Sequence, residues 1–277
     1  MSFGILGFGE VGSSLKKVYE LAGRGDEVVV RDPCKGFDSP LSGCDIVNVC
    51  IPFSSGHKHF ASVLRGLGLR PGCVVMIQST VGFGCTDSVQ AEIPGVVCVH
   101  SPVRGVHPNL AEGILAFEKY VGLSDMFFND ESAKSRVTDH LRSLNIRPVV
   151  CRSKESELAK IVSTTLYGLN IAAITDVSRM CDKRGVDFGT VFTRWQMGYN
   201  AGYRALGMPN VCRPVLTPIP ISKEGEGSGG EKRVIGGHCV LPNCAILRDM
   251  GEPTLPEFVL RYSDETSLTH RSAESEG

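Results

Sequence analysis

The chain has 277 residues, of which 42% are hydrophobic, and its formal net charge is -1. This length and apolar content predict one or two globular domains rather than a disordered chain. The balanced charge gives no sign of nucleic acid or of an anionic membrane surface as a partner. No apolar run reaches the ~18 residues needed to cross a membrane, and the N-terminus lacks the pattern of a signal peptide.

Cysteine usage indicates the compartment. The chain has eleven cysteines, an odd number, and no CxxC pair. Several of them lie in apolar, strand-like runs, which is typical of reduced thiols in the cytoplasm. A zinc site from His238, Cys239 and Cys244 is a weak alternative, because this spacing matches no common ligand pattern. We therefore expect a cytoplasmic protein without a bound metal.

The first residues predict a dinucleotide-binding unit. A short apolar strand over residues 2–6 precedes Gly7-Phe8-Gly9-Glu10-Val11-Gly12, and a helical pattern follows through about Leu21. Gly7 permits the tight turn, Gly9 lets the backbone approach a pyrophosphate, and Gly12 lets the helix pack on the strand. N–H groups at the helix N-terminus would face the phosphates. A glycine-rich turn without a ligand is the alternative.

A carboxylate lies at the carboxyl end of the second expected strand. This strand, EVVVR, ends at Asp32, 20 residues after Gly12. A carboxylate there can accept hydrogen bonds from the adenosine ribose and repels the 2′-phosphate of NADP. Arg31 and Lys35 could instead accept that phosphate. On balance the sequence predicts NAD as the cofactor.

Strands and helices continue to alternate along the first half of the chain. Strands are expected at 45–51, 73–78, 96–100 and 147–151, and helices at 57–67 and 131–145. This order predicts a doubly wound parallel sheet, a Rossmann-like α/β fold that binds ligands at the carboxyl ends of its strands. Pro52, Ser79 and Thr80 follow two of these strands, so we expect them beside the nicotinamide. Residues 1–152 are thus the predicted NAD-binding domain.

The pattern changes after residue 152. No proline interrupts the segment from Glu155 to about Lys183, and its apolar residues recur at helical spacing. This long helix is apolar over much of its circumference, which favours burial and a homodimer. We expect a smaller, mainly helical domain over residues 153–262 and a disordered polar tail over 263–277. Lys160 and Thr164 lie one turn apart on this helix, where a lysine is more often a solvated surface charge.

A cysteine stands in a rigid frame near the end of the chain. Residues 236–243 read GGHCVLPN. The two glycines allow close backbone approach to Cys239, and a helix beginning near Pro242 would direct N–H groups towards its thiol. Such surroundings favour the nucleophilic thiolate. An inert cysteine in a tight turn is the alternative.

Taken together, these motifs resemble the UDP-glucose/GDP-mannose dehydrogenase family. They occur in the family's order across residues 1 to about 250, and they are GFGEVG, DIVNVCIPFS, QSTVGFGCT, SPVRG, ELAKIVSTT and IGGHCVLPN. The GGHC form is most similar to the branch that acts on UDP-N-acetylated hexosamines. The resemblance implies NAD-dependent oxidation of a primary alcohol of a sugar or nucleotide sugar to a carboxylate, with two hydride transfers.

The resemblance also implies roles for single residues. Cys239 matches the nucleophile that traps the aldehyde as a thiohemiacetal and then becomes a thioester. Lys160 matches the lysine that stabilises the developing oxyanion, and Thr80 matches the threonine that positions the water or alcohol. Glu112 matches a family glutamate if the alignment takes a one-residue gap.

Three departures limit what the resemblance implies. The family's aspartate four residues after the cysteine is Asn243 here, and an amide cannot take a proton from water. The family's asparagine one turn after the lysine is Thr164. The family's C-terminal nucleotide-sugar domain has no matching motif, and a partner chain could supply it.

Two other interpretations stay open. One is a two-electron dehydrogenase of the 6-phosphogluconate and β-hydroxyacid group, which shares the glycine motif, a helical second part and a catalytic lysine. The other is a non-catalytic NAD-binding protein. The glycine-framed cysteine favours the sugar dehydrogenase over the first. The joint presence of Thr80, Lys160 and Cys239 argues against the second.

Overall fold

The computed structural model of the chain describes residues 1–53, 56–105, 109–219, 222–223, 231–232, 235 and 239–262. Contacts divide the chain into two compact units, separated in the sequence between Lys160 and Ile161. The domain boundary predicted at residue 152 precedes the long helix, whose residues 153–160 belong to the first unit. The frame 236–238 before Cys239 and the polar tail 263–277 lie outside the described residues.

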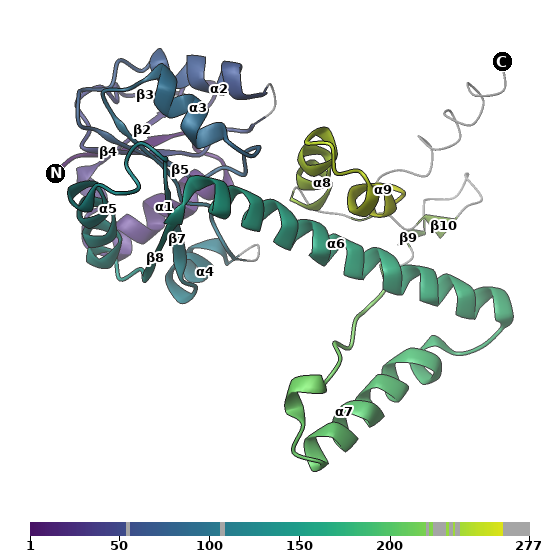
Figure 1. Cartoon of the computed structure of the whole chain (residues 1–277). Coiled ribbons are helices and arrows are strands. Elements are labelled where there is room, and N and C mark those ends of the chain that lie inside the picture. Colours follow the sequence, from purple (N-terminus) through teal and green to yellow (C-terminus); the bar gives the residue numbers. More distant parts are fainter. Residues whose placement is uncertain are drawn as a thin grey trace, which may run out of the picture. The chain divides into compact units, whose positions relative to one another are not determined.

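The first unit is built on an eight-stranded sheet with the order β3-β2-β1-β4-β5-β6-β7-β8 (Figure 1). The strands are β1 (Phe3–Leu6), β2 (Val28–Asp32), β3 (Phe37–Asp38), β4 (Ile46–Val49), β5 (Val74–Ile77), β6 (Val97–His100), β7 (Lys119–Leu123) and β8 (Pro148–Arg152). Neighbours pair in parallel except β2 with β3 and β6 with β7. The predicted doubly wound, Rossmann-like architecture is confirmed, but the sheet is mixed rather than wholly parallel.

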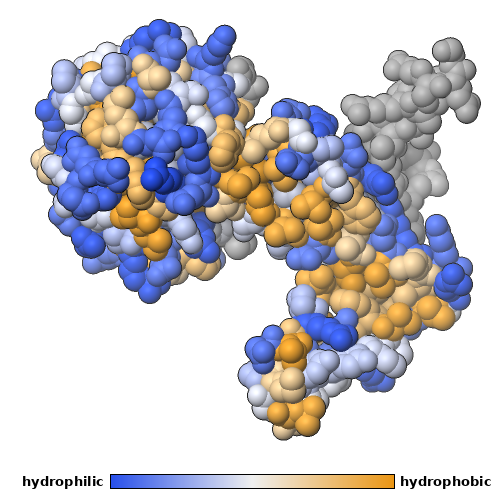
Figure 2. Space-filling view, in the orientation of Figure 1, coloured by the Kyte–Doolittle hydropathy of each residue, from blue (hydrophilic) through white to orange (hydrophobic). Residues whose placement is uncertain are grey.

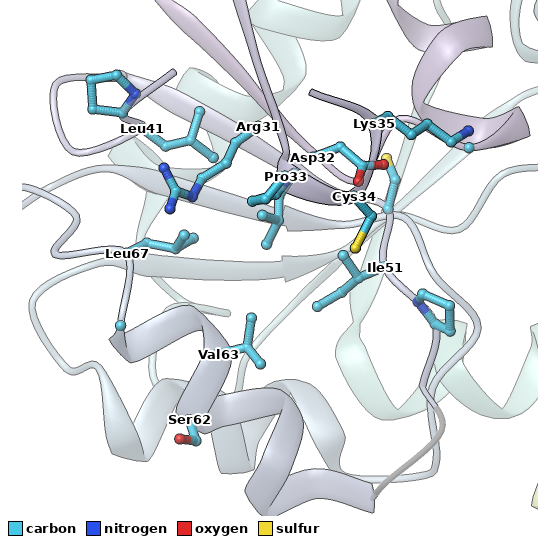
Figure 3. A pocket seen from close by; sticks show the side chains of 17 residues that line it. Arg31, Asp32, Pro33, Cys34, Lys35, Leu41, Ile51, Ser62, Val63 and Leu67 are labelled. Atoms are coloured by element: carbon cyan, nitrogen blue, oxygen red, sulfur yellow. The ribbon is translucent and has the colours of Figure 1, made fainter. Parts of the chain in front are cut away.

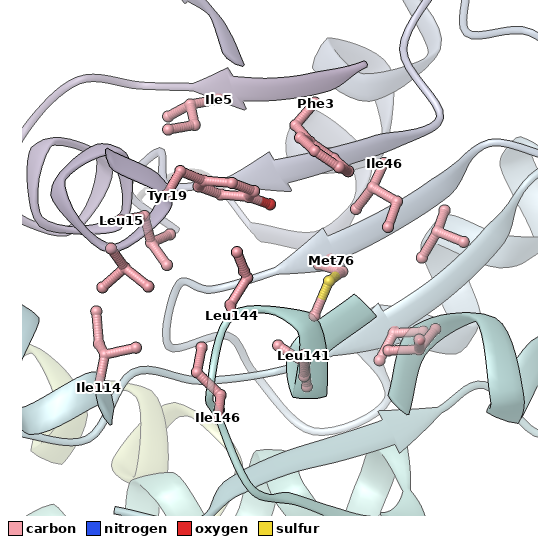
Figure 4. Close-up of a cluster of buried hydrophobic side chains, with 14 of the residues drawn as sticks. Phe3, Ile5, Leu15, Tyr19, Ile46, Met76, Ile114, Leu141, Leu144 and Ile146 are labelled. Carbon is pink, nitrogen blue, oxygen red and sulfur yellow. The ribbon is translucent and has the colours of Figure 1, made fainter. Parts of the chain in front are cut away.

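Helices cover both faces of this sheet, which explains why its strands are short runs that are apolar on both sides. The helices are α1 (Glu10–Leu21), α2 (Gly56–Arg65), α3 (Cys85–Glu92), α4 (Leu110–Ala116) and α5 (Glu131–Ser143). On one face, α1, α4 and α5 enclose Phe3, Ile5 and Met76 (Figure 4). On the other face, residues of α2 and α3 pack against Val47 and Val75.

The turn between β1 and α1 is set by its glycines. Gly7 has a φ of 87°, and a Cβ there would lie 2.9 Å from the Cys50 carbonyl oxygen. A Cβ at Gly12 would overlap the Gly7 carbonyl oxygen, because the helix packs directly on the turn. A Cβ at Gly9 would meet nothing within 4 Å. The fold therefore requires Gly7 and Gly12, whereas Gly9 adjoins open space.

Glu157 fixes the start of the long helix α6 (Ser153–Arg184) to the sheet's helical layer. Its carboxylate accepts hydrogen bonds from the Gly84 N–H at 2.7 Å, the Thr86 N–H at 2.8 Å and the Thr86 hydroxyl at 2.7 Å. These donors begin α3, whose N-cap is Gly84 and has no side chain to satisfy them. Burial nevertheless raises the pKa of Glu157.

The second unit is mainly helical. It continues α6 and adds a π-helical turn (Gly189–Arg194), α7 (Trp195–Ala205), α8 (Val240–Asp249), α9 (Thr254–Leu260) and the pair β9 (Ser222–Lys223) and β10 (Glu231–Lys232). Val240, Cys244 and Val259 form its core with Ala172 of α6. The prediction of a helix near Pro242 is confirmed, since α8 begins at Val240 and Pro242 lies in its first turn.

The long helix is less buried within this chain than the sequence predicts. Leu166 is 43% exposed, Tyr167 62% and Met180 52%. Orange apolar residues gather on the surface of the second unit in Figure 2. The homodimer through this helix stays a prediction. By length and composition α6 would also be long and apolar enough to cross a membrane, contrary to expectation, although core helices of soluble proteins pass the same test.

The turn geometry predicts different outcomes for two glycine substitutions. Gly12→Ala should lower the free energy of unfolding by about 1–3 kcal/mol, because its Cβ would overlap backbone that cannot move away. Gly9→Ala should cost less than about 1 kcal/mol, because it only replaces a glycine N-cap facing open space. Urea denaturation of the two variants measures both values. Equal losses would show that the helix does not pack on the turn as described.

Candidate active site

A cavity of about 760 Å³ lies at the carboxyl ends of β1, β2 and β4 (Figure 3). Gly7 and Gly9 line it from the turn after β1, Asp32 from the end of β2, and Ile51 and Pro52 from the loop after β4. This is the edge at which open α/β sheets bind ligands, beside the point where the strand order reverses. The predicted residues Gly7, Gly9, Asp32 and Pro52 therefore share one cavity.

Asp32 and Lys35 hold the glycine turn from two sides. The Asp32 carboxylate accepts a hydrogen bond from the Phe8 N–H at 2.8 Å, and the Lys35 ammonium donates to the Phe8 carbonyl oxygen at 2.8 Å. Arg31 pairs with Asp38, with 2.7 Å between Nη1 and Oδ1. Both cations that could receive a 2′-phosphate thus already have partners in this structure.

The first turn of α1 faces the same region without a side-chain cap. Its N-cap is Gly9, which makes no side-chain hydrogen bond. Glu10 is exposed in the first turn, and Val11 packs against the core below it. A helix N-terminus without a cap leaves N–H groups available to an anion such as a pyrophosphate.

A second group of residues lies at the ends of β5 and β6. The Ser79 hydroxyl donates to the Ile51 carbonyl oxygen at 2.6 Å. His100 lies with Nε2 3.3 Å from the Ser79 carbonyl oxygen and Nδ1 2.8 Å from the Ser156 hydroxyl oxygen. Because a carbonyl only accepts, a neutral His100 that bonds Ser79 carries its proton on Nε2, and the Ser156 hydroxyl lies between two acceptors, Nδ1 and the Ser153 carbonyl oxygen at 2.9 Å. His100 therefore connects the Ser79–Thr80 segment to α6.

Burial keeps His100 neutral. Its side chain is fully buried, and desolvation lowers its pKa to about 3. The nearby ammonium groups of Lys119 and Lys160 act in the same direction. The histidine thus serves as a neutral hydrogen-bonding bridge rather than as a proton carrier near pH 7.

Two ammonium groups bind three successive carbonyls after β6. The Lys160 ammonium, one turn beyond Ser156 on α6, donates to the Val103 carbonyl oxygen at 3.0 Å. The Lys119 ammonium, at the start of β7, donates to Ser101 at 2.9 Å and to Pro102 at 3.4 Å. Lys119 is 4% exposed, and burial lowers its pKa to about 7.

Sequence reasoning missed both His100 and Lys119. The signal available was an ionisable residue at the end or start of an apolar run, in VCVH and KYVGL. Among the residues predicted for catalysis, Thr80 and Lys160 belong to the first unit, and the His100 bridge links their segments. Thr80 is half-buried beside Ser79.

Cys239, Asn243 and Thr164 belong to the second unit. Cys239 is exposed at the N-cap of α8, and Asn243 is buried one turn later, where its Nδ2 finds no acceptor within the described part of the chain. Thr164 is half-buried on the part of α6 that belongs to the second unit. Glu112 lies in the first turn of α4 and forms an exposed ion pair with Lys17 of α1 at 2.9 Å. Its catalytic role stays a prediction.

The described residues contain no group of three or more His, Cys, Asp or Glu side chains that could hold a metal ion. The zinc alternative involves His238, which lies outside those ranges.

Comparison with known proteins gives a structural likeness alone. No family model matches the sequence, and neither does any curated protein. The UDP-D-ManNAc dehydrogenase of Pyrococcus horikoshii has a similar structure, with a TM-score of 0.68 and 17% identity over 95% of this chain and 68% of that one. A UDP-glucose dehydrogenase of Pyrobaculum islandicum has a TM-score of 0.66 and 19% sequence identity, and the match covers 94% of this chain and 67% of that one.

A shorter solved structure is covered almost completely. The 3-hydroxyisobutyrate dehydrogenase of Mycobacterium tuberculosis gives a TM-score of 0.58 and 17% identity, over 93% of this chain and 90% of that one. At these identities the likeness shows a shared fold. The chain thus has the fold of these dehydrogenases, a Rossmann-like sheet followed by a helical region.

The neutral state of His100 predicts a pH dependence of stability. Its pKa falls from 6.5 to about 3 on folding, so below pH 6.5 the unfolded chain binds a proton that the folded chain does not. Stability should therefore be lost as the pH falls from 6.5 towards 3, by about 1.4 kcal/mol per pH unit for this group. Urea denaturation between pH 6 and pH 4 measures the slope for wild type and His100→Asn.

In His100→Asn the free energy of unfolding should depend less steeply on pH, by about 1.4 kcal/mol per pH unit, whatever the stability of the variant at pH 7. His59→Gln, at an exposed position, should keep the wild-type slope. Identical slopes in wild type and His100→Asn would mean that His100 is not held neutral.

Proposed function

We propose that this protein is an NAD-dependent dehydrogenase that oxidises a primary alcohol of a sugar or nucleotide sugar, like the UDP-glucose/GDP-mannose dehydrogenases. The observation that carries the proposal is the carboxyl edge of the sheet. There the glycine turn and Asp32 open onto one cavity, and Thr80 and Lys160 stand on segments joined through His100. The fold shared with the UDP-sugar dehydrogenases supports it.

In this proposal each part of the cofactor has a binding partner. Asp32 accepts from the adenosine ribose hydroxyls, the N–H groups at the start of α1 bind the pyrophosphate, and Pro52, Ser79 and Thr80 border the nicotinamide. The bound cofactor supplies a hydride acceptor. Asp38 and the Phe8 carbonyl occupy Arg31 and Lys35, which supports NAD over NADP.

The chain's own residues then carry the oxidation. Thr80 orients the alcohol, whose proton passes to water, and the Lys160 ammonium stabilises the alkoxide that remains. Loss of a hydride from carbon gives the aldehyde, and the Cys239 thiolate adds to the carbonyl carbon to form a thiohemiacetal. Loss of a second hydride gives a thioester, and water releases the carboxylate and the thiol. This sequence requires Cys239 to reach the substrate held at Lys160.

A second candidate is a two-electron hydroxyacid dehydrogenase that uses Lys160 without the cysteine. Two observations favour it. The chain covers 90% of the M. tuberculosis 3-hydroxyisobutyrate dehydrogenase, and Asn243 offers no base for thioester hydrolysis. A panel of UDP-sugars, free sugars and hydroxy acids, assayed for NADH formation, separates the two substrate classes.

The relative affinities for NAD and NADP test the proposed binding of the adenosine ribose by Asp32. Wild type should bind NAD at least about tenfold more tightly than NADP, because Asp32 repels a 2′-phosphate. Asp32→Ala should reduce this difference between the NAD and NADP affinities, and calorimetric titration measures both affinities.

Asp38→Asn should raise the NADP affinity by no more than about fivefold, because it frees Arg31 from an exposed ion pair worth ~0–1 kcal/mol. Tighter NADP binding by wild type would show that Arg31 or Lys35 outweighs the carboxylate. If the protein bound neither NAD nor NADP, the proposal that NAD is its cofactor would be wrong.

Thiol labelling and product stoichiometry test the cysteine step. A thiol reagent should modify Cys239 faster than Cys34, the other exposed cysteine, and Cys239→Ala should stop oxidation at the aldehyde. If Asn243 leaves no base for hydrolysis, wild type should release one NADH per substrate or accumulate a thioester, and Asn243→Asp should speed turnover. Spectrophotometry and mass spectrometry measure both.

Cys34→Ala is the matched control and should keep wild-type stoichiometry. Two NADH per substrate in wild type would show that hydrolysis proceeds without an acid at 243. Full activity of Cys239→Ala on a hydroxy acid would favour the second candidate.

A further inference from the structure

Lys119 is a buried cation whose role neither the fold nor the proposed mechanism explains. Its side chain is 4% exposed, and within the described residues its ammonium binds the Ser101 and Pro102 carbonyl oxygens. The charged or titratable groups that act on it are the Cys50 thiol and the Lys160 ammonium, and no carboxylate of the described chain is among them. Burying an ammonium with carbonyl partners alone is unfavourable. Burial accordingly lowers the pKa of Lys119 to about 7, and both of these hydrogen bonds go to one loop.

The segment that Lys119 orders is the one that anchors Lys160. Ser101, Pro102 and Val103 run from the end of β6, and Val103 accepts the hydrogen bond of Lys160 at 3.0 Å. Peptide units are planar, so holding the Ser101 and Pro102 carbonyls restricts how the next peptide unit can turn. The ring of Pro102 fixes the φ angle between the peptide units that carry the Ser101 and Pro102 carbonyls, so these two units turn less freely against each other. The direction of the Val103 carbonyl thus depends on Lys119.

Apolar and cation–π contacts also hold this loop, since Val103 is buried in the core and the Arg104 guanidinium lies over the Phe117 and Tyr120 rings. The Ser101 hydroxyl is buried and finds no partner in the described part of the chain. Beyond Val103, Arg104 and Gly105 are exposed. The hydrogen bonds from Lys119 are therefore the main polar contacts that hold the two carbonyls before Val103.

We infer that Lys119 is the positioning residue for Lys160: by clamping the Ser101 and Pro102 carbonyls it fixes the Val103 carbonyl, which directs the Lys160 ammonium. The catalytic consequence rests on the proposed function, in which Lys160 stabilises an alkoxide. The structural claim does not, because the orientation of Lys160 can be observed without any substrate. A misdirected ammonium should lower turnover roughly ten- to hundredfold while binding of the alcohol changes little.

Crystal structures of the full-length variants test the clamp directly. In Lys119→Met the Val103 carbonyl should turn, and the Lys160 ammonium should leave it. Lys119→Arg retains the donors and should keep the Lys160–Val103 hydrogen bond. Val121→Ala removes buried volume from the same strand and leaves the Lys119 donors in place, so it should lose stability and keep that bond. Lys119→Gln replaces Lys119→Met if the latter does not fold.

Kinetics on any substrate found in the NADH assay give the second readout. Lys119→Met should lower kcat and leave KM and the NAD affinity near their wild-type values, and Lys119→Arg should restore most of the turnover. A Lys160 ammonium that still binds the Val103 carbonyl in Lys119→Met would overturn the inference, whether or not the protein oxidises sugars. A displaced Lys160 in a protein that shows no dehydrogenase activity would uphold the clamp and reject the proposed function.

Discussion

The arrangement at the carboxyl edge of the sheet depends on one buried, neutral histidine. His100 connects the end of β6 to the Ser79 carbonyl after β5 and to Ser156 on α6. Desolvation lowers the pKa of His100 to about 3, so the ring stays neutral near pH 7 and makes these contacts without adding a charge to the edge. Glu157, the next residue on α6, caps α3 in the same region. Together these contacts determine where Thr80 and Lys160 stand.

The other end of the edge is held by a separate set of contacts. Asp32 and Lys35 bind the two polar groups of Phe8, and Gly12 lets α1 pack on the turn that contains it. A turn fixed in this way leaves Gly9 open towards the cavity. Preorganised backbone donors lose little entropy when an anion binds, which is why a rigid turn suits phosphate recognition.

Local patterns predicted much of this fold. The glycine motif, Asp32, six strands and the start of α8 near Pro242 follow from short-range spacing. The strand β7 and the helices α3 and α4 were missed, because β7 opens with a lysine and contains Gly122 and both helices are short. His100 and Lys119 were missed because their burial depends on packing between distant segments. The ion pair between Glu112 and Lys17 could not be foreseen either, because the two residues are 95 positions apart in the sequence.

The most direct test of the central claim is a crystal structure of the protein with NAD. The adenosine ribose should bind Asp32, the pyrophosphate should lie on the first N–H groups of α1, and the nicotinamide should lie beside Thr80 with Lys160 on its substrate side. A dinucleotide bound outside the cavity, or a nicotinamide directed away from Thr80 and Lys160, would contradict the central claim.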